Sequence, residues 1–347
     1  MGSTDDQPTA GDPVDGVRPL DLDRRVDPEF AAALAARPLR GIRRLDQVRR
    51  AREVMEASRP PWTAPGTVDV VDHHAPAADD NQIQVRVYRP TDPGGGRPQA
   101  ETRPALYWIH GGGLIVGSVT MDDRRSTALV EQLGITVASV EYRLAPEHPY
   151  PTPLEDCYAG LTWLVEHADE LGIDTDRIAV GGASAGGGLA AGLALLARDR
   201  GGPPIRFQLL RYPMLDDRNR TPSSHAQLDP RVWHREANHL GWSAYLGDGA
   251  GSDGIEPYAA PGRASDLAGL PPAIVTVGDL DLFLDEDVDY ARALSRAGVP
   301  TELHVYPGAY HGAINDNPDA GLTQRWFRDE ANALVRALPE PPGPASA

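Results

Sequence analysis

The sequence AVGGASAGG, residues 179–187, decides the fold, because it places a serine between a strand signal and a helix signal. Gly182 and Gly186 flank Ser184 two positions away on each side, which is the spacing of a nucleophile elbow. Such an elbow strains the backbone at the serine and crowds these two neighbours, so both must be small. The helix that follows points its N-terminus at the reaction centre, where it favours an oxyanion. By itself, the pentapeptide fits a helix N-cap serine about equally well.

The surrounding pattern supports the elbow, because strand and helix signals alternate along most of the chain. Apolar or β-branched runs predict strands at 68–73, 82–88, 105–109, 135–140, 177–181, 205–212, 273–277 and 302–306. Helical spacing predicts helices near 28–37, 44–58, 121–133, 154–166, 185–198, 230–246, 285–297 and 320–337, with a Gly/Pro loop at 93–98. The alternation predicts an α/β protein with a mostly parallel central sheet and helices on both faces. Residues 214–258 interrupt it and are interpreted as an insert.

A second glycine-rich segment, HGGG at 110–113, directly follows the strand predicted at 105–109. Consecutive glycines let backbone N–H groups approach a ligand closely, since no Cβ stands in the way. Aimed at a tetrahedral intermediate, one such donor lowers the barrier by about 3–4 kcal/mol. The position upstream of the elbow favours this interpretation over a merely flexible loop. We therefore assign the oxyanion donors to the N–H groups of Gly112, Gly113 and Ala185.

A serine nucleophile needs a base, and the base needs an orienting carboxylate. In hydrolases with a nucleophile elbow, the chain order is serine, then acid, then histidine. His311 lies on a loop past the last predicted strand, where its imidazole can reach Ser184. His304 within that strand and His110 in the glycine loop are interpreted as structural residues.

Several carboxylates compete for the position of the acid. Side chains just past the carboxyl end of a parallel strand lie at the edge of the sheet where active sites form. The candidates after the strand predicted at 273–277 are Asp279, Asp281, Asp285, Glu286 and Asp287. Position alone favours Asp279 or Asp281 and leaves the choice between them open. The run as a whole also suits a solvated helix start.

Composition and charge exclude several classes of function. The formal net charge of -17 and the pI of about 4.9 disfavour binding to nucleic acid or to anionic membrane surfaces. Hydrophobic residues make up 41% of the chain, which is enough for a buried core. Cys157 is the only cysteine, so neither an internal disulfide nor a zinc site built on several cysteines is expected. No run approaches the roughly 20 apolar residues of a membrane span and no secretory signal is recognised, so a cytoplasmic protein without stable membrane insertion is expected.

Together, these motifs resemble those of the hormone-sensitive-lipase-like esterases, the bacterial family IV carboxylesterases of the α/β-hydrolase fold. The resemblance covers about residues 60–337 and rests on HGGG at 110–113, YRLAPEHP at 142–149, LED at 154–156, SAGG at 184–187, DLFLDE at 281–286 and YHG at 310–312. In that family the first acid of the D-x-L-x-D-E pattern is the catalytic one, which implies Asp281. The family usually has an acid directly before the serine, where this chain has Ala183.

The resemblance implies a serine carboxylesterase that acts on small-molecule esters with short- to medium-chain acyl groups through Ser184, His311 and Asp281. It implies no metal and no organic cofactor. The nearest alternative is an amide, lactone or N-acyl hydrolase with the same triad, and the alternative from another class is a non-catalytic small-molecule receptor. The sequence leaves the oligomeric state open, with a homodimer among the alternatives.

The resemblance also implies a helical cap over the core. We divide the chain into a flexible leader with N-terminal cap helices (1–60), the first part of the core (61–213), a cap insert (214–258), the second part of the core (259–338) and a frayed tail (339–347). Within the insert, Trp233, Trp242 and Tyr245 are candidates to line the acyl or alcohol pocket. Each of them also fits the core of the cap.

Overall fold

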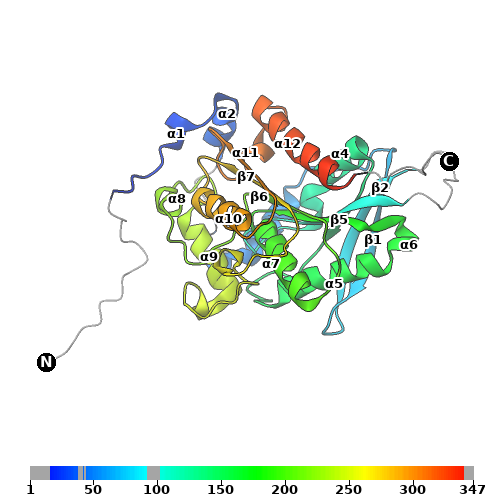
Figure 1. Ribbon diagram of the computed structural model, residues 1–347. Coiled ribbons are helices and arrows are strands. Elements are labelled where there is room, and N and C mark those ends of the chain that lie inside the picture. Colours follow the sequence, from blue (N-terminus) through cyan, green and yellow to red (C-terminus); the bar gives the residue numbers. More distant parts are fainter. Residues whose placement is uncertain (1–15, 38–41, 43, 92–101, 340–347) are drawn as a thin grey trace.

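The computed structural model describes residues 16–37, 42, 44–91 and 102–339, which are built around an eight-stranded sheet (Figure 1). The strand order is β1-β2-β4-β3-β5-β6-β7-β8. β2 runs antiparallel to both of its neighbours, and every pair from β4–β3 to β7–β8 is parallel. The strands are β1 (Val68–Pro76), β2 (Gln82–Pro90), β3 (Arg103–Ile109), β4 (Thr136–Val140), β5 (Ile173–Ala183), β6 (Phe207–Arg211), β7 (Ala273–Gly278) and β8 (Thr301–Tyr306). The predicted mostly parallel α/β sheet is confirmed.

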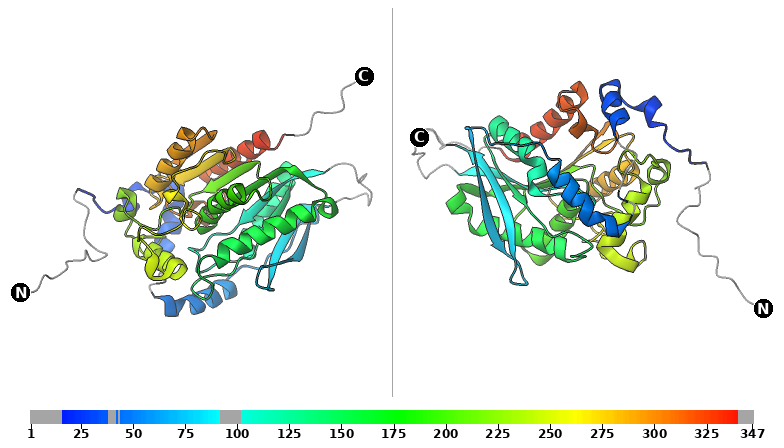
Figure 2. Two further views of the ribbon diagram at one scale, coloured as in Figure 1. Left: turned by 60° about the horizontal axis from the view of Figure 1, so that its bottom comes forward. Right: turned by 180° about the vertical axis from the view of Figure 1, so that it is seen from behind.

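Helices cover both faces of this sheet, as the two views in Figure 2 show. One face carries α5 (Thr152–Glu166), α7 (Ala185–Arg200) and α10 (Leu284–Arg296), and the other carries α4 (Asp123–Leu133) and α12 (Gly321–Ala337). The N-terminal helices are α1 (Leu22–Arg25), α2 (Pro28–Ala36) and α3 (Val48–Ala57), and the others are α6 (Ala168–Leu171), α8 (Pro222–Ala226), α9 (Arg235–Leu246) and α11 (Ala313–Asp316). None of the described helices combines the length and apolarity that a membrane crossing requires.

Two apolar cores result, one on each face of the sheet. Along β3, Tyr107 and Ile109 belong to the core that includes Leu189 of α7. Leu106 and Trp108 point the other way, into the core on the opposite face. Because both faces are covered, β3 is apolar along most of its length rather than alternating with polar residues. Burial of each large apolar side chain contributes about 1.5–3 kcal/mol to folding.

The helix predicted near 230–246 begins later than expected, at Arg235. The Asp229 carboxylate accepts hydrogen bonds from the Arg231 N–H at 2.9 Å and from the Arg231 guanidinium at 2.6 Å. This local turn competes with helix formation for the same backbone groups. Trp233 therefore lies before α9 and not within a helix, so the start predicted near residue 230 is wrong.

The sequence patterns do not predict α1, α6, α8 and α11. Each of these helices has only four or five residues, which is too short for an apolar periodicity to show. Residues 1–15 of the expected leader, the Gly/Pro loop at 93–98 and residues 340–347 of the expected tail lie outside the described residues.

The parallel strands bring distant segments of the chain to one edge of the sheet. The carboxyl ends of the parallel strands β5, β6, β7 and β8 lie along one edge of the sheet, so the segments that follow β5, β7 and β8 meet there. α11 follows β8, and the N-terminal α2 lies beside it (Figure 1). α2, near the start of the described residues, therefore lies beside α11 near the edge that carries the candidate site.

Candidate active site

Ser184 occupies the sharp turn between β5 and α7. Its backbone has φ 57° and ψ -122°, a conformation that costs a non-glycine residue about 1–3 kcal/mol. Backbone hydrogen bonds hold the turn: the Ser184 N–H donates to Arg211 O at 2.9 Å, and Ser184 O accepts from Gly188 and Met214 at 3.0 Å each. The surrounding structure thus maintains a strained turn that presents the hydroxyl at the start of α7.

Close backbone packing explains the glycines on either side of Ser184. A Cβ added to Gly182 would lie 2.2 Å from Gly186 O. A Cβ added to Gly186 would lie 2.0 Å from Ile109 O. Both contacts are with backbone atoms, which cannot rotate away. The spacing seen in the sequence is therefore a steric requirement of this turn.

Gly186→Ala is expected to destabilise the fold by about 1–3 kcal/mol and to reduce ester hydrolysis, because the new methyl group collides with Ile109 O. Chemical denaturation and a hydrolysis assay measure the two effects. Gly66→Ala is the matched control, since nothing lies within 4 Å of its added Cβ. A Gly186→Ala protein as stable and active as the control would contradict the steric account.

Side chains from the segments after β7 and β8 meet Ser184. His311, between β8 and α11, places Nε2 2.9 Å from Ser184 Oγ and Nδ1 2.8 Å from Asp281 Oδ2. A carboxylate only accepts hydrogen bonds, so Nδ1 carries the proton and Nε2 accepts from the serine hydroxyl. Asp281 is buried, and its Oδ1 accepts from the Phe283 N–H at 3.0 Å. Hydroxyl, imidazole and carboxylate thus form one continuous chain of hydrogen bonds.

Two aromatic rings flank the His311 imidazole. The centroid of the Tyr212 ring lies 4.7 Å away and that of Phe283 5.2 Å away, both in edge-to-face arrangements. Contacts of this kind contribute about 0.5–1.5 kcal/mol each and restrict how the imidazole can rotate. The sequence analysis did not identify Tyr212 or Phe283, because no local pattern indicates which rings surround a histidine on a distant loop.

The other carboxylates after β7 have different partners. Asp279 forms an ion pair with Arg25 at 3.1 Å. Asp285 and Glu286 accept hydrogen bonds from backbone N–H groups of the segment between β6 and β7, at 2.7 and 2.8 Å. Among the described residues, Asp281 is the carboxylate that hydrogen-bonds His311. The geometry thus favours Asp281 over Asp279 as the partner of His311, a choice that position along the chain alone left open.

Asp287 differs from its neighbours, because its carboxyl group is buried on α10 without a hydrogen bond. Neither of its oxygens has a partner among the described residues. Burial raises its pKa well above the ordinary value, and the nearby Glu286 and Asp281 raise the pKa further. Folding therefore keeps this carboxyl protonated at pH values where the unfolded chain ionises it. The associated stability is fully present below the ordinary pKa and is lost as the pH rises toward the raised value.

Asp287→Asn is expected to raise stability relative to the wild type by about 1–3 kcal/mol at pH 8 and to have a smaller effect at pH 5. The amide has nearly the same shape and cannot ionise. Urea unfolding at the two pH values measures the difference. Asp289→Asn on the same helix is the control, because that side chain is exposed. A gain from Asp287→Asn that does not grow with pH would contradict the assignment of a buried, protonated acid.

The HGGG segment lies directly against the turn at Ser184. A Cβ added to Gly111 would lie 3.4 Å from Ser184 Cβ. Gly112 and Gly113 have φ values of 123° and 59°, in the region that favours glycine. Within the part of the chain that the structure describes, the N–H groups of Gly112, Gly113 and Ala185 donate to no other protein group. These donors remain available to a ligand beside the serine.

His110 supports this loop from within the core. Its Nδ1 lies 2.8 Å from Gly111 O, and its ring stacks on Tyr142 with 4.3 Å between the centroids. The Tyr142 hydroxyl donates to His110 O at 2.9 Å. Burial lowers the pKa of His110 to about 4, so the imidazole is neutral at pH 7. These contacts fit the structural role expected for His110.

Arg52 of α3 contacts the same loop from the N-terminal part of the chain. Its guanidinium donates to Ile115 O at 2.7 Å and to Ala145 O at 2.6 Å, and it pairs with Glu147 at 2.9 Å. Arg52 thereby links the HGGG loop to the YRLAPEHP segment. The sequence analysis expected a helix at 44–58 but missed this role, because the two carbonyl partners lie 63 and 93 residues further along the chain.

The three aromatic candidates of the insert lie in two different environments. Trp233 is partly exposed, and a Cβ added to Gly113 would lie 2.1 Å from its indole ring, which therefore rests on the HGGG loop. Its Nε1–H donates to Asn238 at 3.1 Å. Trp242 and Tyr245 are almost fully buried and belong to the apolar core. Trp233 is thus the one of the three whose ring contacts the oxyanion loop.

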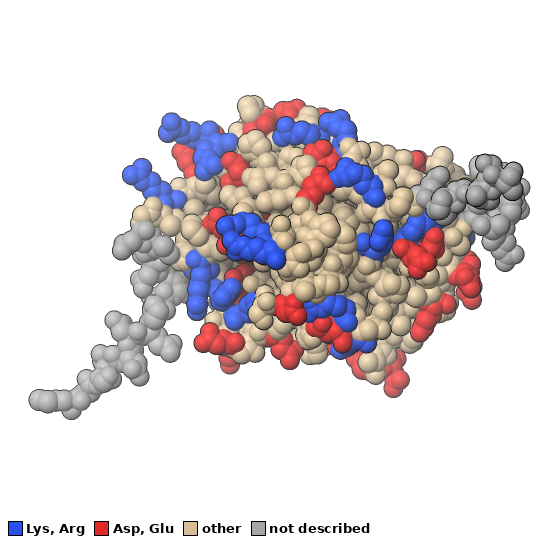
Figure 3. Space-filling model, in the orientation of Figure 1, with Lys and Arg blue, Asp and Glu red and all other residues tan. Residues whose placement is uncertain are grey.

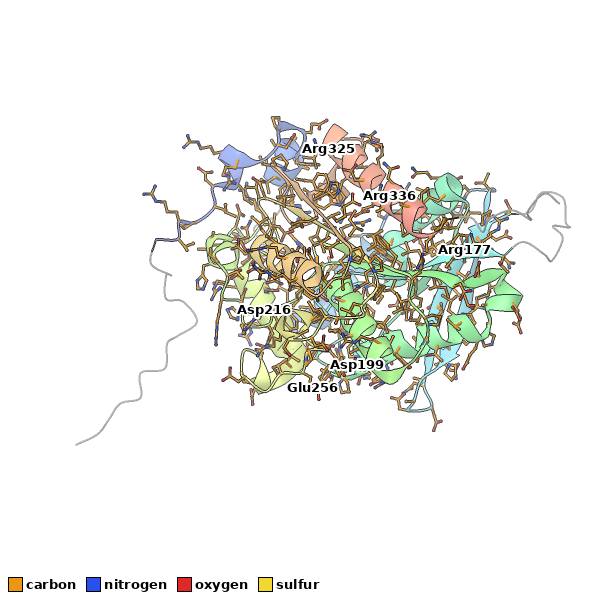
Figure 4. All side chains as sticks on the ribbon, in the orientation of Figure 1. Arg177, Asp199, Asp216, Glu256, Arg325 and Arg336 are labelled. Carbon is orange, nitrogen blue, oxygen red and sulfur yellow. The ribbon has the colours of Figure 1, made fainter. Side chains whose placement is uncertain are left out.

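Two surface hollows lie away from the triad. Their volumes are about 310 and 490 Å³, and both are lined by Tyr150 and Glu256, whose side chains hydrogen-bond each other. Asp199 lines the smaller hollow and is labelled with Glu256 in Figure 4. Neither hollow is lined by Ser184 or its partners, so both are separate from the candidate active site.

The charged groups of the described residues form no candidate metal site. Among the described residues, no group of three or more His, Cys, Asp or Glu side chains is placed to hold a metal ion. Basic and acidic side chains are interspersed on the face shown in Figure 3. That face offers no continuous basic track for a phosphate backbone.

The chain is similar to a known family and to characterised proteins. A family model described as the alpha/beta hydrolase fold matches residues 106–315. Esterase LipI of Mycobacterium tuberculosis (strain ATCC 25618 / H37Rv) is 41% identical over 235 residues, which cover 67% of this chain and 71% of that protein. Ethyl acetate hydrolase of Pseudomonas putida is 37% identical over 252 residues, which cover 70% of this chain and 77% of that protein.

The chain is also similar to solved structures of esterases, and these matches cover more of its length. The structure of a bacterial heroin esterase has a TM-score of 0.83 and 39% identity, and the match covers 91% of this chain and 99% of that one. The structure of esterase LipW from Mycobacterium marinum has a TM-score of 0.77 and 38% identity, with coverage of 92% and 98%.

Proposed function

This chain belongs to the alpha/beta hydrolase fold family and is a carboxylic ester hydrolase, and we propose that Ser184 is its nucleophile, His311 its base and Asp281 the acid that orients the base. The relationship to hormone-sensitive-lipase-like esterases expected from the motifs is confirmed. The observation that carries the site assignment is the chain of hydrogen bonds from Ser184 through His311 to Asp281, at 2.9 and 2.8 Å.

The first half-reaction forms an acyl-enzyme. Ser184 Oγ attacks the ester carbonyl carbon while His311 Nε2 takes the hydroxyl proton. The N–H groups of Gly112, Gly113 and Ala185 stabilise the negative charge that develops on the carbonyl oxygen, each by about 3–4 kcal/mol. When the tetrahedral intermediate collapses, the C–O bond to the alcohol breaks and His311 returns the proton to the leaving oxygen.

The second half-reaction hydrolyses the acyl-enzyme. A water molecule attacks the acyl carbon as His311 Nε2 takes one of its protons, and the same amide donors hold the oxyanion. Collapse releases the carboxylic acid and returns the proton to Ser184 Oγ. Asp281 stabilises the imidazolium in both halves and keeps Nδ1 protonated.

Residues 214–258 and the N-terminal helices form, in this proposal, a cap that borders the substrate site. Support comes from Trp233, whose indole rests on Gly113 beside the assigned oxyanion donors. Trp242 and Tyr245 are assigned to the apolar core beneath this cap. A cytoplasmic location stays a prediction of the sequence, and a homodimer stays one of the alternatives for the oligomeric state.

A panel of p-nitrophenyl esters with acyl chains of increasing length tests the proposed substrate class. We expect kcat/KM to be highest for short to medium chains and to fall for long ones. A matched p-nitroanilide is expected to react far more slowly than the ester of the same acid. Preferential cleavage of the anilide would favour the amide-hydrolase alternative, and binding of esters without turnover would favour a receptor.

A further inference from the structure

Arg37, at the C-terminal end of α2, joins three parts of the chain around the candidate site. Its Nε and one terminal nitrogen donate to the two carboxyl oxygens of Asp316, at 2.8 and 2.7 Å. Its other terminal nitrogen donates to Arg231 O at 3.2 Å. The guanidinium also lies over the Tyr310 ring, 5.5 Å from its centroid. α2, the segment after β8 and the insert thus meet at one side chain.

The Asp316 side of this junction holds the loop that carries His311. The Tyr310 hydroxyl, one residue before His311, donates a hydrogen bond to Asp316, which closes the loop on its far side. The Tyr310 ring also packs edge-to-face on Phe30 of α2, with 6.2 Å between the centroids. Arg37 therefore binds the carboxylate of Asp316, which joins the residue before His311 to the helix after it.

The Arg231 side of the junction holds the segment that carries Trp233. Arg231 lies two residues before Trp233, in the turn that delays the start of α9. The Trp233 indole rests on Gly113 of the oxyanion loop. The hydrogen bond from Arg37 to the Arg231 carbonyl oxygen thus links the segment that carries Trp233 to the loop that carries His311.

Few side chains can make these contacts at the same time. A guanidinium is planar and carries five donors, so it can bind a carboxylate with two parallel bonds and still reach a carbonyl. Both partners are partly buried, with 30% of the Arg37 side chain and 17% of the Asp316 side chain exposed. Burial makes the geometry more rigid than that of a surface ion pair.

We propose that Arg37 is a positioning residue for His311 and for Trp233, an inference that rests on the function proposed above. Its loss is expected to make both the loop that carries His311 and the segment that carries Trp233 more mobile. Because small displacements of reacting groups have large effects on rate, kcat is expected to fall by about 10- to 100-fold. KM is expected to rise as well, since Trp233 loses its support.

Removal of the guanidinium leaves α2 attached to the rest of the molecule. The Asp27 N–H donates to Gly308 O at 3.0 Å, and Asn317 donates to Glu29 O at 2.9 Å. Glu29 in turn accepts from the Gly321 N–H at 3.0 Å. These contacts do not involve Arg37, so an Arg37 variant tests the junction rather than the docking of the helix.

The experiment compares Arg37→Met with Arg37→Lys and with the control Arg44→Met. Arg44 makes the same two-bond contact with Asp46, at 3.0 and 2.8 Å, but both side chains are more than half exposed. Hydrolysis of p-nitrophenyl acetate is measured after titration of the reactive serine with a fluorophosphonate, which gives kcat per working site. We expect kcat per site to fall in Arg37→Met, to recover only partly in Arg37→Lys and to be unchanged in Arg44→Met.

A purely structural role would reduce the number of sites that titrate and leave kcat per site unchanged, which would overturn the inference. An Arg37→Met protein with wild-type kcat and KM would overturn it too.

Should Arg37→Met fail to fold, Asp316→Asn replaces it under the same criterion. In the double variant Arg37→Met/Asp316→Asn, kcat is expected to fall by less than the product of the two single effects, because the two residues share the contact between guanidinium and carboxylate. Failure of the wild type itself to hydrolyse esters would count against the proposed function and is visible before any variant is measured.

Discussion

Ser184→Ala is expected to lower kcat for ester hydrolysis by about 10⁴- to 10⁶-fold while the protein stays folded. The methyl group cannot attack a carbonyl, so the acyl-enzyme cannot form. The amide donors of Gly112, Gly113 and Ala185 stay in place and account for the residual rate. Steady-state kinetics with p-nitrophenyl acetate measure the loss, and circular dichroism checks the fold.

Ser139→Ala is the matched control for this variant. Ser139 is also a buried serine, on β4, and its hydroxyl has no hydrogen-bond partner among the described residues. Its replacement is expected to leave kcat unchanged. Hydrolysis by Ser184→Ala at a rate close to that of Ser139→Ala would contradict the assignment of the nucleophile.

Glu330→Gln is expected to destabilise the fold by about 3–5 kcal/mol at pH 7, because it removes the countercharge of a buried ion pair. Glu330 of α12 binds the Arg211 guanidinium through two bonds, at 2.9 and 2.6 Å. Arg125 lies 3.8 Å from the same carboxylate. Without the negative charge, Arg211 and Arg125, with 3% and 15% of their side chains exposed, lose the carboxylate that neutralises both of them. Urea unfolding measures the loss.

The effect of Glu330→Gln is also expected to depend on pH. Burial by itself raises the pKa of Glu330, but the Arg211 guanidinium outweighs it and holds the pKa below the ordinary value. The stabilisation is present above the ordinary pKa of a glutamate and is lost as the pH falls through the lowered one. The difference in free energy of unfolding between Glu330→Gln and the wild type should therefore become smaller at acidic pH.

Glu53→Gln is the control for this pair, since Glu53 forms an exposed ion pair with Arg50 at 2.9 Å. Exposed pairs of this kind contribute about 0–1 kcal/mol. A Glu330→Gln protein no less stable than Glu53→Gln would show that the buried pair does not contribute as described.

Much of the fold and the core of the candidate site are predictable from sequence, because both depend on local rules. The spacing of Gly182, Ser184 and Gly186 follows from close backbone contacts within the turn and with Ile109 of the neighbouring β3, which recur at any nucleophile elbow, so the pattern itself indicates the geometry. The order of serine, acid and histidine follows from parallel strands whose carboxyl ends share an edge. The choice of Asp281 over Asp279 came from the resemblance, since both lie at that edge.

The residues that support the site are not predictable in the same way. Arg37 and Asp316 are 279 residues apart, and Tyr212 and His311, which are in contact, lie in the segments that follow two different strands, β6 and β8. Contacts of this kind depend on how finished elements pack, and no local pattern records them. Trp233 was misplaced for a related reason, because the Asp229 turn overrides the helical spacing that continues through it.

Labelling of the folded wild-type protein with a fluorophosphonate probe, followed by peptide mass spectrometry, tests the central claim most directly. The account predicts one adduct, on the hydroxyl of Ser184, and almost none when His311 is replaced by alanine. An adduct on a different residue, or no adduct on a protein that hydrolyses esters, would contradict it.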